Sequence, residues 1–100
     1  MGEKLELDIQ TEDGQSGGRY FVVIDGYESE MTFSRLSPQT IIVDHTGVPE
    51  ALSGRGIAFA LAEFAIAAAR AGGWKIIPLC PYMRAQSLKH PEWADAIRQN

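Results

Sequence analysis

The hydrophobic period of the chain changes twice in its second half, and this limits the folds open to it. Thr40–His45 is a short β-branched run, which is typical of a buried strand. Arg55–Arg70 then repeats Ile57, Leu61, Phe64 and Ala68 at helical spacing until Gly72 and Gly73 stop it. Trp74–Cys80 is a second apolar strand. A strand, a helix and a strand in this order form a βαβ unit, which almost always closes as a right-handed parallel crossover.

The first half of the chain predicts antiparallel strands. Lys4–Gln10 alternates apolar and charged residues, as a strand with one buried face does, and a Gly-rich turn follows at Thr11–Gly18. Arg19–Asp25 and Tyr27–Leu36 are joined by a turn at Gly26 and are expected to form a hairpin. We therefore expect an α/β fold with N-terminal antiparallel strands and a central βαβ crossover in one mixed sheet.

The C-terminal residues predict short helices. Pro81 suits the first position of a helix, which would run over Pro81–Lys89 and end before Pro91. A last turn or two is expected over Glu92–Arg98. One hundred residues can enclose one modest core, so we expect a single domain over residues 1–100.

Charge and composition exclude several classes of function. The formal net charge of −4 argues against nucleic-acid binding and favours a cationic amine as partner. No apolar run reaches the roughly 18 to 20 residues that span a bilayer, so no membrane association is expected. The single cysteine, Cys80, cannot form an internal disulfide, which makes the cytoplasm the expected location. We expect a monomer or a weak homodimer.

Three features meet at one edge of the predicted sheet. Ligands of open α/β sheets bind beyond the carboxyl ends of parallel strands, where the crossover helix also begins. His45 ends the first parallel strand, Cys80 ends the second, and the segment SGRGIA, residues 53–58, leads into the helix between them. Glycine and alanine let a phosphate approach the free N–H groups of a helix start, and Arg55 adds positive charge. The alternative is that these glycines only break a loop.

Three segments resemble a known family. HTGVPEALSGRGIAFALAEFA, PLCPYM and HPEWAD, in this order, are similar to the GCN5-related N-acetyltransferases, and to their minimal branch of small single-domain proteins. The resemblance covers residues 21–96. The family pattern has Arg or Gln, then two residues, Gly, one residue, and Gly or Ala. Gly56 and Ala58 match its last two fixed places, whereas Ser53 stands at the first.

The resemblance implies acetyl-CoA as acyl donor and no metal. It implies that the pantetheine arm of the donor lies between the ends of the two parallel strands and bonds to the backbone of Val43, Asp44 and His45. The diphosphate would lie on the helix start. The residues expected there are Ser53, Gly54, Arg55, Gly56, Ile57 and Ala58.

Acetyl transfer to an amine needs a base, a donor to the oxyanion and a proton for the departing thiolate. His45 carries an imidazole that can accept a proton near neutral pH; the alternative is an inert residue at a strand end. Cys80 directly precedes a helix, where the dipole favours a thiolate; the alternative is a small buried hydrophobe. Tyr82 could protonate the thiolate, or only pack.

Two functions from different classes follow from these features. The first is an enzyme that acetylates a small amine, or a lysine or N-terminus of a protein. The alternative is a CoA-binding or protein-interaction module with little catalysis, which Ser53 and the small size of the chain favour. The acceptor cannot be read from the sequence.

Overall fold

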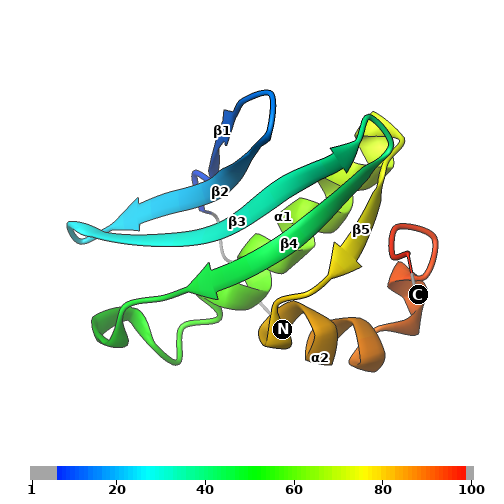
Figure 1. Cartoon of the computed structure of the whole chain (residues 1–100). Helices are drawn as coiled ribbons and strands as arrows, with labels where there is room; N and C mark the ends of the chain where they lie inside the picture. Colours follow the sequence, from blue (N-terminus) through cyan, green and yellow to red (C-terminus); the bar gives the residue numbers. More distant parts are fainter. Residues whose placement is uncertain (1–6, 99–100) are drawn as a thin grey trace.

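Five strands form one mixed sheet in the computed structural model, which describes residues 7–98 (Figure 1). Neighbours in the sheet follow chain order, from β1 to β5. The first four strands are antiparallel, while β4 and β5 are parallel and pair from Thr40 with Lys75 to Val43 with Pro78. The predicted fold class and crossover are confirmed. The strands are β1 (Gln10–Asp13), β2 (Gly17–Ile24), β3 (Tyr27–Ser37), β4 (Thr40–Gly47) and β5 (Lys75–Pro78).

The crossover helix is α1 (Ile57–Gly72), and α2 (Pro81–Lys89) follows β5. Gly73 ends α1 in the left-handed region at φ 78°, and its N–H donates to the Ala69 carbonyl at 2.8 Å. A Cβ on Gly72 would lie 1.9 Å from the ring of Trp74, so any other residue there would have to displace that ring. The stop predicted at this pair is confirmed. Short 3-10 turns occupy Glu50–Leu52 and Pro91–Trp93.

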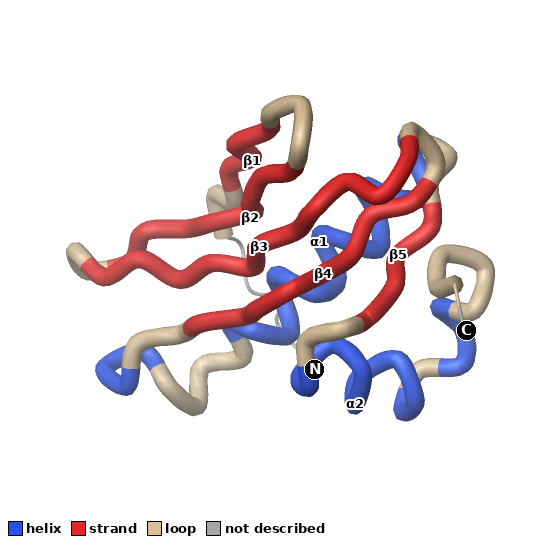
Figure 2. Tube along the Cα trace, viewed as in Figure 1, coloured by secondary structure: helices blue, strands red, loops and turns tan. Residues whose placement is uncertain are grey.

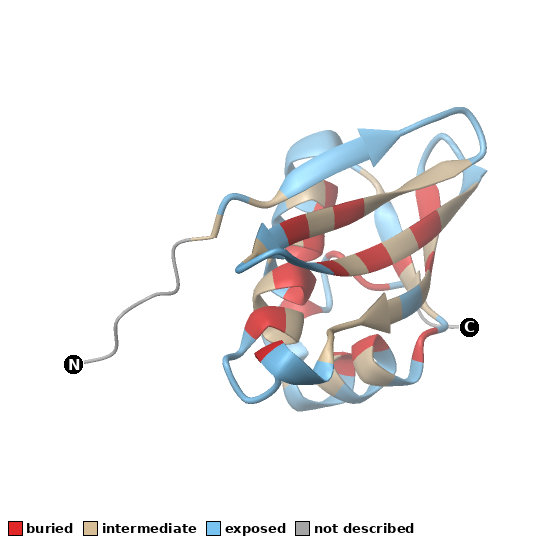
Figure 3. Ribbon diagram, turned by 90° about the vertical axis from the view of Figure 1, so that its left-hand side faces the viewer, coloured by how far each residue is buried: buried red, intermediate tan, exposed pale blue. Residues whose placement is uncertain are grey.

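The core lies between α1 and one face of the sheet, which we call the inner face (Figure 2). Buried residues alternate with more exposed ones along the strands, as Figure 3 shows. The alternate residues point to the opposite, outer face. Trp93 is buried in the core, and Trp74 is half-buried against it. The buried apolar residues of the inner face are Tyr20, Val22, Met31, Phe33, Ile41, Val43 and Ile76.

The first strand lies further along the chain than the alternation predicts. Residues 4–6 of the expected strand lie outside the described residues, and residues 7–9 are not strand, although Leu7 and Ile9 pack against the core. β1 and the start of β2 occupy the segment expected to be a turn. A Cβ on Gly18 would lie 1.9 Å from the Glu12 carbonyl oxygen. The glycine-rich stretch thus allows close pairing of β1 with β2.

The last strand is shorter than predicted. It ends at Pro78, which has no N–H, and the Leu79 N–H donates to Ile77 instead of to β4. Past Trp93 the chain is not helical: Ile97 forms a parallel bridge beside Ile76, at the open edge of β5. The expected last turn is therefore only partly present. No helix among residues 7–98 is long and apolar enough to cross a membrane.

Candidate active site

A β-bulge in β4 sets the directions of the side chains at the site. His45 pairs with Thr32 and Val43 with Phe33, so Asp44 is an extra residue. Val43 lies opposite the buried Phe33 on the inner face. Thr46, which pairs with the buried Met31, is on the inner face as well. Asp44 and His45 are therefore turned to the outer face.

Cys80 lies on the inner side, where β4 and the end of β5 part. Its N–H donates to the Val43 carbonyl at 2.9 Å, and its Sγ lies 3.3 Å from Thr46 Oγ1. The side chain is only 3% exposed. Cys80 is the N-cap residue of α2, as predicted, and the chain turns into that helix while β4 runs on to Gly47. The two parallel strands thus separate just past Cys80.

His45 lies on the other side of β4 from Cys80. The expectation that it ends its strand is wrong, because β4 continues for two residues. His45 is exposed and pairs with Thr32 on the outer face. The structure therefore brings Thr46 and Cys80 together, whereas His45 and Cys80 face opposite sides of the sheet. Asp44, beside His45, accepts a hydrogen bond from Ser34 Oγ at 2.7 Å.

A cavity of about 250 Å³ lies at the start of α1. Gly54 and Gly56 bound it with left-handed backbone at φ 80° and 76°, which glycine adopts without steric cost. No side chain caps the helix, so its first N–H groups are left for another acceptor. α1 begins at Ile57, two residues later than predicted, because Gly56 is the N-cap. The lining residues are Val48, Leu52, Ser53, Gly54, Gly56, Ile57, Ala58, Phe59 and Tyr82.

Arg55 alone among the residues predicted at the helix start does not line this cavity. Its guanidinium lies 3.4 Å from the Asp25 carboxylate, in the turn between β2 and β3. Both side chains are exposed, so solvent weakens the pair. The loop that precedes α1 is thereby linked to the tip of the hairpin.

Tyr82 brings a proton donor to the same cavity from α2. Burial raises the pKa of its phenol, and the nearby Cys80 acts in the same direction. A raised pKa keeps the hydroxyl protonated at neutral pH. The neutral Tyr82 hydroxyl can therefore donate a hydrogen bond to an anion formed beside it.

Comparison with known proteins assigns the family. The family model for GCN5-related N-acetyltransferases matches residues 19–96. The chain belongs to the GCN5-related N-acetyltransferase family. The solution structure of a GCN5-like protein from Staphylococcus aureus has a similar fold, with a TM-score of 0.69 at 23% identity, over 91% of this chain and 89% of that one. No curated protein sequence matches the chain significantly.

Membership in the GCN5-related N-acetyltransferase family makes acyl transfer the class of chemistry, with acetyl-CoA as the family's donor. The residues of this acetyltransferase-family site fit such a donor. Two glycines with left-handed backbone and an uncapped helix start leave room and N–H groups for a diphosphate. Past Val43, β4 runs on to Gly47 without pairing to β5, so its backbone is in a position to pair with an extended arm.

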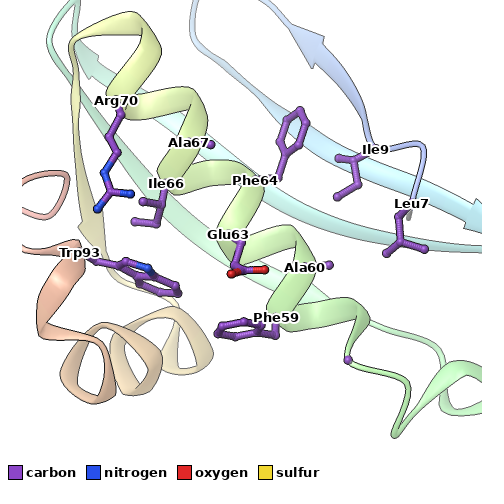
Figure 4. A pocket seen from close by; sticks show the side chains of 11 residues that line it. Leu7, Ile9, Phe59, Ala60, Glu63, Phe64, Ile66, Ala67, Arg70 and Trp93 are labelled. Carbon is purple, nitrogen blue, oxygen red and sulfur yellow. The ribbon is translucent and has the colours of Figure 1, made fainter. Parts of the chain in front are cut away.

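The acetyltransferase-family site also has parts that sequence reasoning missed. Thr46 contacts Cys80, and Phe59 joins the small cavity to a larger depression of about 610 Å³ that crosses α1. Figure 4 shows this depression with Leu7 and Ile9 on one side of the helix and Trp93 on the other. Thr46 could not be found by strand alternation, because the bulge shifts the alternation by one residue.

Proposed function

We propose that this chain transfers an acetyl group from acetyl-CoA to an amine. The donor would lie on the inner side of the sheet, and the acceptor would approach from the outer face through the gap past Val43 and Cys80. The observation that carries this proposal is the cavity at the start of α1, which also contains Tyr82, two residues from the point where the strands part.

Residues 53–58 would bind the donor's diphosphate. Ser53 can donate its hydroxyl, and the N–H groups of the first turn of α1 add the favourable end of the helix dipole. The cavity is too small for a whole coenzyme. The nucleotide part would extend onto the depression that shares Gly56 and Phe59 with it. The backbone of residues 43–45 would bind the pantetheine arm.

The chemistry would use both sides of β4. The amine nitrogen attacks the thioester carbonyl, a C–N bond forms and the C–S bond breaks. His45, on the acceptor side, would take the proton from the amine, and Tyr82, on the donor side, would give a proton to the thiolate. Cys80 lies on the donor side, where its thiol can accept the acetyl group or can support the departing sulfur.

A second candidate is a CoA-binding module with little catalysis. Two observations favour it: Ser53 stands at the family's Arg or Gln position, and Arg55 is paired with Asp25. Such a module would bind acetyl-CoA without turning it over.

Calorimetry with acetyl-CoA and mass spectrometry with a broad panel of amines test both candidates. We expect saturable binding and transfer of one acetyl group per amine. His45→Ala should lower kcat by about 100-fold, the size of a general-base contribution, and Tyr27→Phe, on the exposed hairpin, should leave it unchanged.

Three results would contradict these assignments. Absence of saturable binding would remove both candidates, and binding without turnover would leave only the module. Full activity of both Cys80→Ala and His45→Ala would show that the assigned roles are wrong. An acetylated protein that disappears in Cys80→Ala would identify Cys80 as an acetyl carrier.

A further inference from the structure

Two arginines differ from the other four arginines among residues 7–98. The chain has 13 acidic and nine basic residues, so carboxylates are in excess. Arg84 and Arg98 nevertheless have no carboxylate within ion-pairing distance among residues 7–98, and both line one cavity. The four arginines that do form ion pairs with carboxylates are Arg19, Arg35, Arg55 and Arg70.

This cavity, which we call the arginine pocket, has a volume of about 280 Å³. The end of β5, the side of α2 and the C-terminal segment each contribute to its wall. Ile77 follows the fully buried Ile76, so it points to the outer face of the sheet. The arginine pocket therefore opens on the same face as His45. Its lining residues are Ile77, Pro78, Leu79, Arg84, Ser87, Leu88 and Arg98.

A side-chain bond fixes the Arg98 guanidinium, whereas the bonds of Arg84 fix its backbone. The Arg98 N–H donates to the Ile76 carbonyl at 2.8 Å, and its guanidinium donates to Thr40 Oγ1 at 3.3 Å. Arg84 is in α2, where its N–H donates to the Cys80 carbonyl and its own carbonyl accepts from Ser87 Oγ. Both side chains are exposed, so solvent weakens the repulsion between the two charges, and a bound anion would offset the part that remains.

The arginine pocket adjoins the proposed reaction centre. Pro78 and Leu79 line it and directly precede Cys80. Ile77 pairs with Ile42 of β4, two residues before Asp44 on the same face. The Arg98 guanidinium bonds to Thr40, five residues before His45 on β4, so an acceptor that reaches both would carry its oxyanion at a distance from its amine.

We infer that the arginine pocket binds a carboxylate or phosphate group of the acceptor, so that the acceptor is a small amine that also carries an oxyanion. This inference rests on the proposed acetyl transfer. Arginine binds both oxyanions through paired N–H donors. The volume suits one small polar group rather than a coenzyme or a folded protein surface.

Matched acceptors test the inference in steady-state kinetics. ω-Amino acids of increasing chain length are compared with their amides, and aminoalkyl phosphates of increasing chain length with the corresponding amino alcohols. We expect KM to be about tenfold lower for the anionic partner, and Arg84→Gln or Arg98→Gln to remove this advantage. Lys89→Gln removes the same charge from α2 outside the arginine pocket, and it should leave the advantage intact. The anion with the lower KM identifies the class.

A second measurement needs no acetyl transfer. Sodium acetate and inorganic phosphate are titrated into the protein alone, and backbone amide NMR signals of Leu79 and Ser87 are followed. Saturable shifts that vanish in Arg84→Gln and Arg98→Gln, but not in Lys89→Gln, support the arginine pocket even if no amine is acetylated. Absence of such shifts overturns it. Acetylation that does not distinguish acid from amide overturns its role in acceptor binding and leaves the proposed function standing.

Discussion

The two faces of the sheet differ in what their residues do. The inner face is apolar and packs on α1, with Tyr20, Met31 and Ile76 almost fully buried. On the outer face Arg19 forms ion pairs with Glu12, Glu28 and Glu30. Burial of apolar area stabilises the fold far more than exposed ion pairs do. The inner face therefore supplies most of the stability. Outer-face residues near the gap past Val43 and Cys80 contribute less to it.

The largest expected effect is a difference in the free energy of unfolding between alanine substitutions at two neighbouring residues of β5. Ile76 is buried on the inner face and Ile77 is only half-buried on the outer face. We expect Ile76→Ala to lower the free energy of unfolding by about 3 kcal/mol, because it leaves a cavity, and Ile77→Ala by about 1 kcal/mol. Equilibrium urea unfolding measures both. Equal losses would contradict the distinction between the faces.

Alkaline pH should lower the free energy of unfolding through Tyr20, a buried residue of the inner face. Burial raises the pKa of Tyr20 to about 12, whereas an unfolded tyrosine titrates near pH 10. The neutral phenol is favoured by folding, so its contribution is complete below about pH 10 and is lost as pH rises towards 12. The free energy of unfolding should fall by about 2 kcal/mol over this pH range.

Chemical denaturation between pH 9 and 12 measures this fall. Tyr20→Phe should reduce it, and the exposed Tyr27→Phe should not. The same pH dependence in wild type and Tyr20→Phe would show that the Tyr20 hydroxyl is not the cause.

Restoring the family residue should strengthen the donor site. Ser53 lines the cavity at the start of α1 and is exposed, so a longer side chain can be accommodated there. We expect Ser53→Arg to lower the Kd for acetyl-CoA by roughly three- to tenfold, because a guanidinium can donate two parallel N–H bonds to a phosphate group. Calorimetry at two salt concentrations measures this. Unchanged affinity would place the diphosphate elsewhere.

The smallest effect should come from the outer-face ion pairs. Arg19→Gln removes a cation from among three carboxylates and from above the ring of Phe21. The side chains are partly exposed, so we expect a loss of under about 1 kcal/mol that shrinks in high salt. Urea unfolding at low and high salt measures it. A loss as large as that of Ile76→Ala would show that the outer face is structural.

The crossover could be predicted from sequence because several signals agree. The period changes at the helix, Gly72 and Gly73 stop it, and apolar strands flank it. The position of β1 could not be predicted, because the exposed Gln10–Asp13 has no apolar alternation and pairs through close backbone contact at Gly18.

The candidate site was only partly predictable. Five of the six residues expected at the start of α1 line one cavity, because topology determines where a crossover helix begins. The bulge at Asp44 was not predictable, since an inserted residue leaves no trace in the hydrophobic pattern. It turns His45 away from Cys80. The pairing of Arg55 with Asp25 depends on the hairpin tip, which is distant in sequence.

Backbone amide NMR during titration with CoA tests most directly whether the donor lies at the start of α1. We predict that the largest shifts occur at residues 53–58 and 43–47, while Arg19 and Glu28, on the outer face, keep their signals. Saturable shifts confined to the outer face, with none at residues 53–58, would contradict the account.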